Sequence, residues 1–156
     1  MKKTIIFFTA SVLILVPLAA ASLTLLSPNG GERWILGETK AITWKAENWT
    51  GHVNISIRKP SNCSYLHQAT VLEKIAFNVP AEFGKYMWIV GNINGGVLVP
   101  RREDYQMFPG FGGCNCFQIV ITSADGPSPS LSDTSDNIFY ICKHKIQNTM
   151  ATKTKK

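Results

Sequence analysis

The chain has 156 residues, with 16 Lys and Arg against 10 Asp and Glu, and this length suits one small domain. Lys2 and Lys3 lie at the start and five lysines follow Cys142, so that nine basic residues balance the ten acidic ones in between. A nucleic-acid-binding protein concentrates positive charge on its fold, and this distribution therefore argues against that class.

Residues 1–21 are typical of a cleavable signal peptide. Two lysines are followed by an apolar stretch over residues 5–18, and alanines at 19–21 supply the small residues that signal peptidase requires. A membrane span needs about 20 apolar residues, and this stretch is shorter. We therefore predict cleavage before Ser22 and an extracytoplasmic location, at the cell surface, in the periplasm or in the medium. We expect no transmembrane anchor in the mature chain.

Seven segments after the leader have the alternation or the β-branched and aromatic content of strands. In one of them Ile42 and Trp44 share a side, opposite Thr43 and Lys45. The seven predicted strands are Leu23–Leu26, Thr39–Ala46, His52–Lys59, Val71–Val79, Lys85–Gly91, Phe117–Ser123 and Asn137–Cys142.

The clearest alternation lies in residues 52–59. Its apolar and polar members are expected to face opposite sides of a sheet. Val53, Ile55 and Ile57 should face inward, and Asn54, Ser56 and Arg58 outward. Short strands separated by Gly, Pro and Asn turns predict an all-β fold, an antiparallel β-sandwich of immunoglobulin or fibronectin type over residues 22–142. A basic, disordered tail is expected over residues 143–156.

Four cysteines, Cys63, Cys114, Cys116 and Cys142, favour two disulfide bonds in an exported chain. Cys114 and Cys116 are two residues apart and would lie on one face of an extended segment. A bond between them would close a strained ring, so we expect each to reach a distant partner, Cys63 or Cys142. Which pairs with which is open. No paired spacing of a structural zinc site is present.

Three groups of residues recur together in a known family. The first group is Leu26–Glu32 (Leu-Ser-Pro-Asn-Gly-Gly-Glu) with Trp34, Gly37, Ile42 and Trp44; the second is Tyr86, Trp88, Val90 and Gly91 with Phe117–Ile121; the third is Asp133–Asp136 with Phe139 and Ile141. This pattern resembles the N-terminal domain of fungal cell-wall glucan-assembly proteins and the Ser/Thr-rich glycosylphosphatidylinositol-anchored surface family. The resemblance implies an exported β-sandwich module that acts at the cell surface.

The same motifs have a physical interpretation. Pro, Asn and Gly at 28–31 favour a chain reversal, and Trp34 and Trp44 are expected in the core. Asp133 and Asp136 are a weak candidate for a Ca²⁺ site, because their oxygens lie close in sequence. Hydrogen bonds from these side chains to turn backbone are the favoured alternative. We expect no metal and no cofactor.

A long connection over residues 92–116 departs from the family pattern. Its aromatic residues Tyr105, Phe108 and Phe111, with Arg101 and Arg102, are candidates for a surface that binds sugars or a protein partner. Long loops in compact domains often carry function. Covering the sheet edge is an equal alternative for these aromatic side chains.

Catalytic patterns are missing from the sequence, since the three histidines are scattered and no nucleophile motif occurs. Asn48 and Asn54 each begin an Asn-x-Ser/Thr sequence and are candidate glycosylation sites in a host that modifies them. We expect a non-catalytic binding module for a cell-envelope glycan or a surface protein. An adhesive or structural spacer is the first alternative, and a small secreted enzyme is the second.

Overall fold

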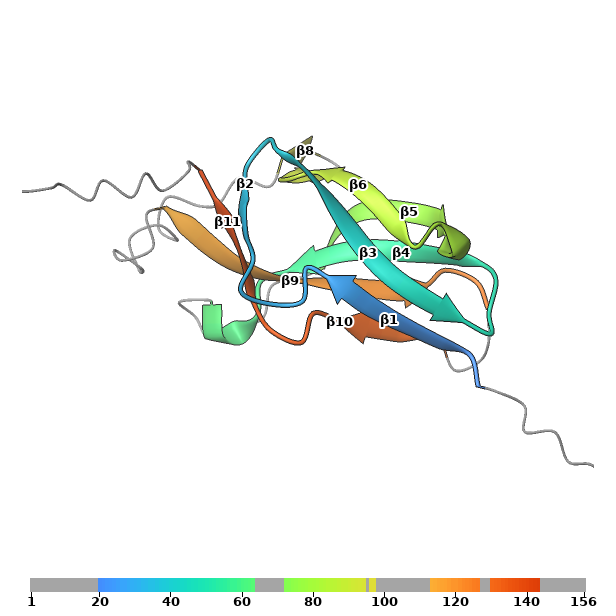
Figure 1. Ribbon diagram of the computed structural model, residues 1–156. Coiled ribbons are helices and arrows are strands. Elements are labelled where there is room, and N and C mark those ends of the chain that lie inside the picture. The colour runs from blue at the N-terminus through green and yellow to red at the C-terminus, as the bar shows by residue number, and fades with distance from the viewer. Residues whose placement is uncertain (1–19, 64–71, 95, 98–112, 127–129, 144–156) are drawn as a thin grey trace, which may run out of the picture.

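The computed structural model describes residues 20–63, 72–94, 96–97, 113–126 and 130–143 (Figure 1). This part of the chain is mostly β-strand, as expected, with two short 3-10 helices, η1 (Ser61–Cys63) and η2 (Ala81–Phe83). None of its helices has the length and apolar character needed to cross a membrane. Most of the predicted leader and nearly all of the predicted basic tail lie outside the described residues.

The smaller of the two main sheets has three antiparallel strands in the order β1-β3-β6. They are β1 (Ser22–Ser27), β3 (Thr39–Glu47) and β6 (Lys85–Ile89). Leu25 pairs with Trp44 and Ser27 with Thr43, so the pairing register of β1 shifts at Leu26. Such a bulge bends the strand just before the turn that follows it.

The larger sheet has the order β2-β11-β9-β4-β5, and β10 pairs with β9 beyond this path. Its strands are β2 (Arg33–Ile35), β11 (Phe139–Cys142), β9 (Cys114–Ser123), β4 (His52–Arg58), β5 (Glu73–Pro80) and β10 (Ser132–Thr134). All neighbours are antiparallel except β2 and β11, which are parallel. A short hairpin of β7 (Asn92–Ile93) and β8 (Gly96–Val97) completes the fold.

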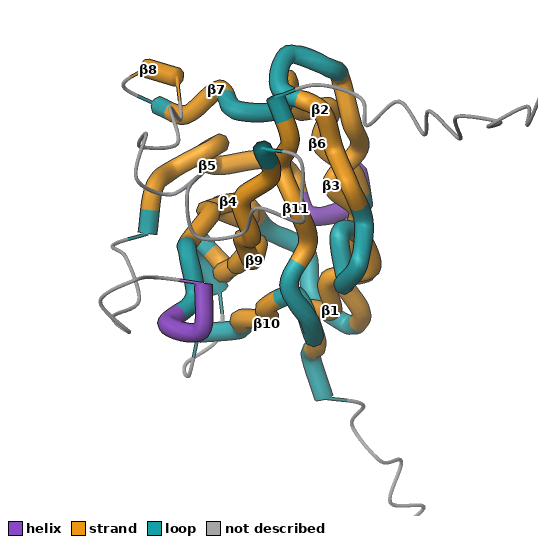
Figure 2. Tube along the Cα trace, turned by 90° about the vertical axis from the view of Figure 1, so that its left-hand side faces the viewer, coloured by secondary structure: helices purple, strands orange, loops and turns teal. Residues whose placement is uncertain are grey.

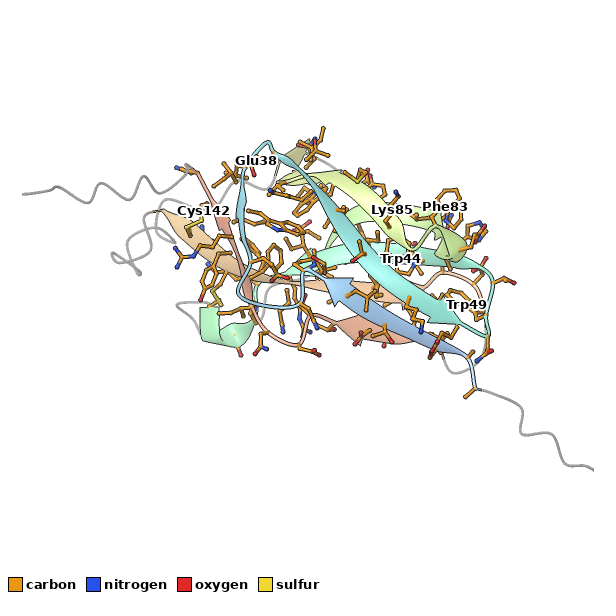
Figure 3. All side chains as sticks on the ribbon, viewed as in Figure 1. Glu38, Trp44, Trp49, Phe83, Lys85 and Cys142 are labelled. Carbon is orange, nitrogen blue, oxygen red and sulfur yellow. A yellow bond between two sulfur atoms is a disulfide. The ribbon has the colours of Figure 1, made fainter. Side chains whose placement is uncertain are left out.

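One apolar cluster joins the buried faces of the two main sheets. Figure 2 shows β1, β3 and β6 along one side of the molecule and β4, β5 and β9 along the other. Trp34 stacks in a tilted geometry against Phe139 at 5.1 Å and against Trp88 at 6.1 Å between ring centroids. Trp44 lies in the interior (Figure 3), where its indole N–H donates to the carbonyl of Ala81 at 2.9 Å. The core positions expected for Trp34 and Trp44 are confirmed.

All seven predicted strands are present, with ends shifted by a few residues. The short strands β2, β7, β8 and β10 were not predicted from the sequence. The expectation that Ser56 faces solvent was wrong, because its side chain is buried with only 3% exposed. β4 lies between β5 and β9, and a residue as small as serine is easily covered by its neighbours there.

The predicted bounds of the long connection, residues 92–116, were also wrong at both ends. Asn92 and Ile93 pair with Gly96 and Val97 in the β7–β8 hairpin. At the other end, β9 already begins at Cys114. The two cysteines expected in a loop therefore belong to a strand of the larger sheet, where side chains two residues apart share a face.

Candidate functional site

The five residues proposed from sequence as a binding surface, Arg101, Arg102, Tyr105, Phe108 and Phe111, lie outside the described residues. Their role stays a prediction. The other residues predicted from the sequence to carry a site lie in the described strands and turns.

The two disulfide bonds join Cys63 to Cys116 and Cys114 to Cys142. Both middle cysteines reach distant partners, as expected, and the structure resolves which partner each takes. Cys114 lies directly opposite Cys142 in the pairing of β9 with β11, and Cys63 joins η1 to the same strand. All four are nearly inaccessible to solvent. Buried disulfides of this kind are typical of an oxidising, extracytoplasmic compartment.

The two aspartates of the weak Ca²⁺ candidate use their carboxylates in local structure. Asp133 accepts the backbone N–H of Leu25 at 2.7 Å and that of Thr134 at 2.8 Å. Asp136 accepts the side-chain amide of Asn29 at 2.7 Å. Among the described residues, no group of three or more His, Cys, Asp and Glu side chains is placed to hold a metal ion. The carboxylates therefore act as acceptors for turns and strand ends.

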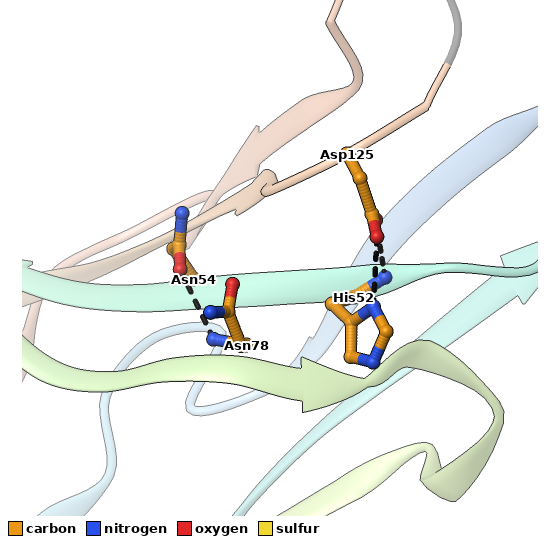
Figure 4. A network of polar contacts seen from close by, with 4 residues as sticks. All are labelled: His52, Asn54, Asn78 and Asp125. Atoms are coloured by element: carbon orange, nitrogen blue, oxygen red, sulfur yellow. Dashed lines mark hydrogen bonds and ion pairs between the residues drawn. The ribbon is translucent and has the colours of Figure 1, made fainter.

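The two glycosylation candidates differ in environment. Asn48 is exposed in the turn after β3, with a left-handed φ of 53°. Asn54 lies within β4, where its side-chain oxygen accepts the backbone N–H of Asn78 at 3.2 Å (Figure 4). The side-chain amide of Asn48 donates to the carbonyl of Ala20, a residue of the predicted leader, at 3.2 Å, so Asn48 is not held by the mature strands in this way.

A second polar contact, between His52 and Asp125, fastens the segment after β9 to the start of β4 (Figure 4). Asp125 accepts the backbone N–H of His52 at 2.6 Å and approaches the ring Nδ1 at 2.8 Å. The hydrogen bond from the His52 side chain, aided by that from its backbone, lowers the pKa of Asp125 below its usual range. Both side chains are about half exposed, and their contacts hold the two segments together.

The two main sheets end next to each other at one open edge. β6 is the last strand of the smaller sheet and β5 the last strand of the larger one. The chain passes from β5 to β6 through η2, which closes one end of this edge. Figure 1 shows η2 where the chain turns from β5 into β6.

The β7–β8 hairpin closes the other end of the edge. The indole N–H of Trp88 on β6 donates to the carbonyl of Asn92 at 2.6 Å. The backbone N–H of Asn94 donates to the carbonyl of Lys74 on β5 at 2.7 Å. The hairpin therefore connects the last strands of both sheets and fixes their separation.

A groove with a volume of about 300 Å³ lies between these boundaries. It is lined by Ile75 and Phe77 of β5, by Tyr86, Met87, Trp88 and Ile89 of β6, and by Asn92, Ile93 and Asn94 at the hairpin. Three of its apolar side chains are strongly exposed, Met87 at 56%, Ile89 at 48% and Phe77 at 47%. Large apolar side chains clustered on a surface are a mark of binding sites.

The chemistry of the groove suits binding. None of its lining residues is acidic, basic or a histidine. Asn92 and Asn94 supply the amide groups at its rim, and Lys74 lies 5.7 Å from the centre of the Phe77 ring. An apolar surface with a few convergent polar groups is the usual composition of a ligand or partner site, whereas acid–base catalysis requires titratable groups close together.

This groove was not predicted from the sequence. Residues 85–91 form a nearly continuous apolar run, from which the exposed side cannot be told from the buried one. Phe77 and Asn78 lie where β5 departs from regular pairing, because Val53 pairs with Val79 and Ile55 with Ala76. The apolar run over residues 85–91 was the only sign in the sequence that an apolar surface could lie here.

Comparison with known proteins found no relationship. No family model matches the chain, no curated protein matches it significantly, and no solved structure does so either.

Proposed function

We propose that the chain is an exported, non-catalytic β-sandwich module of immunoglobulin-like type that binds a protein partner at the cell envelope. The predicted leader, cleaved before Ser22, and the two disulfide bonds support export. The resemblance of the Pro28–Glu32 and Asp133–Asp136 motifs to a family of surface modules supports the envelope as its place of action.

The observation that carries the proposal is the exposed apolar lining of the groove. Met87, Ile89 and Phe77 all present about half of their surface to solvent, in a region that is fixed at both ends. Methionine and aromatic residues are enriched in protein interfaces, and truncation of a central apolar anchor often weakens binding strongly. A polypeptide surface is therefore the partner that this lining fits best.

The competing ligand is an envelope glycan. The Phe77 ring and the amides of Asn92 and Asn94 offer a stacking surface and hydrogen-bonding groups. A glycan site would also be expected to depend on those amides. The apolar side chains of Met87 and Ile89 offer a sugar little, and for that reason we rank the glycan second.

The experiment is a binding assay of the mature, disulfide-bonded protein on envelope fractions of the producing cell, before and after protease treatment. Phe77→Ser and Met87→Ser should each weaken binding about tenfold, the loss of roughly 1.4 kcal/mol expected for an interface anchor. Leu26→Ser is the matched control for Met87→Ser. The Leu26 side chain is about as exposed as that of Met87, at 53%, but it lies on β1, at the opposite edge of the β1-β3-β6 sheet.

Loss of binding after protease treatment, with loss in both groove variants, would support the proposal. Binding that survives protease but disappears in Asn92→Ala and Asn94→Ala would replace the protein partner with a glycan. Envelope association that none of the groove variants changes would favour the spacer role and remove the groove from the account.

A further inference from the structure

Along β6, backbone groups that bond to β3 alternate with groups that no other described strand pairs. The N–H of Trp44 donates to the carbonyl of Gly84 at 2.9 Å, and the N–H of Val90 donates to that of Glu38 at 2.8 Å. Residues directly opposite in an antiparallel pair alternate between bonded and non-bonded pairs. The backbone N–H and C=O groups of the even-numbered residues 84–90 therefore point toward β3. Those of Lys85, Met87 and Ile89 point away from it.

No described strand pairs with this free side of β6. The edge is regular, since its register with β3 runs without a shift from Thr39 opposite Ile89 to Thr43 opposite Lys85. Its outward side chains are Lys85, Met87 and Ile89, all exposed. Natural proteins usually protect a sheet edge with bulges, proline or charged side chains. Between Lys85 and Ile89, β6 has no bulge and no proline, and Lys85 at its start is its only charged residue.

β5, the edge strand on the other side of the groove, is protected against pairing with a further strand. Its pairing with β4 shifts register twice, between Val53 and Ile55 and again between Ile55 and Ser56. Asn78 has a left-handed φ of 48° at the first shift. Bulges twist an edge away from further pairing, and so the two edges differ in their capacity to accept a strand.

We propose that the partner at the open edge is a second copy of this chain, whose β6 pairs antiparallel with β6 about a two-fold axis at Met87. This rests on the proposed function, because it names the protein that covers the exposed part of the groove. In this register Met87 lies opposite Met87 of the second copy, and Lys85 lies opposite Ile89 of the second copy.

The pattern of free groups selects this register. It uses all three outward residues in bonded pairs, and two bonds per pair give about six hydrogen bonds. A shift of two residues leaves only two bonded pairs and about four hydrogen bonds. Like charges directly opposite each other destabilise a strand pair. This register avoids that cost, because Lys85 of each copy lies opposite Ile89 of the other and not opposite the second Lys85.

Self-pairing joins the two β1-β3-β6 sheets into one continuous sheet of twice the width. The two-fold axis makes the contact isologous, so it closes on a dimer and leaves no further free edge of β6. A contact through one strand from each copy is small, and interfaces of that class are weak and transient. We therefore expect concentration-dependent association with a dissociation constant of about 10 µM or weaker.

Sedimentation velocity of the mature, disulfide-bonded protein tests the register through charge. Met87→Lys and Met87→Glu, studied separately, should each remain monomeric at concentrations where the parent chain dimerises, because residue 87 would face its own like charge. An equimolar mixture of the two should form a heterodimer at least as tight as the parent dimer. Ala41→Lys is the matched control, since Ala41 lies opposite Met87 on β3, one strand from the edge, and it should dimerise within about threefold of the parent chain.

Circular dichroism and the thermal midpoint should show that each variant is folded. If Met87→Lys does not fold, a symmetric intermolecular disulfide in Met87→Cys, absent from Ala41→Cys, supports the same register. A parent chain that stays monomeric at about 500 µM, or two variants that fail to associate when mixed, overturns self-pairing. In that event the envelope assay decides the proposed function separately: groove-dependent binding there leaves a foreign protein as the partner.

Discussion

Asn29 and Asp136 exchange two hydrogen bonds across 107 residues of sequence: the side-chain amide of Asn29 donates to the Asp136 carboxylate, and the backbone N–H of Asp136 donates to the Asn29 side-chain oxygen, each at 2.7 Å. Glu32 completes the first turn by accepting the backbone N–H groups of Asn29 and Gly30, both at 2.7 Å. The two sequence motifs that suggested a family are thus parts of one clamp, which fastens the end of β1 to the start of β11.

This clamp predicts coupled losses of stability. Asn29→Ala and Asp136→Ala should each lower the free energy of unfolding by about 1–2 kcal/mol, because the first removes both hydrogen bonds and the second removes the one that the charged carboxylate accepts. The double variant should lose less than the sum of the two single losses. Urea unfolding of all four proteins gives the coupling energy. Losses that add fully would show that the two residues act independently.

Gly30 should tolerate no side chain. Its φ is 140°, and a Cβ atom at this position would overlap the Cβ of Asn137. Gly30→Ala is therefore expected to destabilise the fold by about 3 kcal/mol or more. Gly31→Ala is the control, since Gly31 has a φ of 81° with open space around its Cβ position, and its loss should stay near 1 kcal/mol. Equal thermal midpoints for the two variants would contradict this account.

The two disulfide bonds should each contribute substantially to stability. They join residues 53 and 28 apart in sequence, and loop-closure entropy predicts losses of about 4 and about 3.5 kcal/mol for Cys63→Ser/Cys116→Ser and Cys114→Ser/Cys142→Ser. Proteolysis without reduction, followed by mass spectrometry, identifies the peptides that each disulfide links. Peptides linking Cys63 to Cys142 would refute the pairing.

The same mass spectra give the N-terminus of the mature chain. A chain that keeps Met1 would refute the predicted cleavage before Ser22.

In a host that glycosylates exported chains, Asn48 should be modified and Asn54 should not. Asn48 is exposed in a turn, whereas Asn54 lies in a central strand and bonds to the Asn78 backbone. Asn48→Gln should remove one glycan mass from the secreted protein, and Asn54→Gln should leave the glycan mass unchanged. A glycan found on Asn54 would mean that β4 is modified before it joins the sheet.

Sequence patterns predicted the strands whose two faces differ. Val53, Ile55 and Ile57 alternate with polar residues, and all three are fully buried. A strand such as β2 escaped prediction because three residues around Trp34 are too few to show a period. Its place is set by parallel pairing with β11, more than 100 residues later in the chain, and no local pattern contains that information.

The candidate site was harder to predict than the fold, for a related reason. Met87 and Trp88 are adjacent apolar residues, yet Trp88 packs in the core while Met87 is more than half exposed. Which of the two faces solvent depends on where β6 lies in its sheet. Among the described strands β6 is the last of its sheet, and no described strand pairs with the backbone groups of every second residue; this follows only from the order β1-β3-β6.

Residue-resolved hydrogen exchange along β6 tests the open edge most directly. At low protein concentration the amides of Lys85, Met87 and Ile89 should exchange much faster than those of Tyr86 and Trp88, which face β3. As the protein concentration rises, the three fast amides should become protected together while the other two change little. Protection of Met87 and Ile89 already in the dilute monomer, or no change in their exchange on association, would contradict the account of β6 as the binding edge.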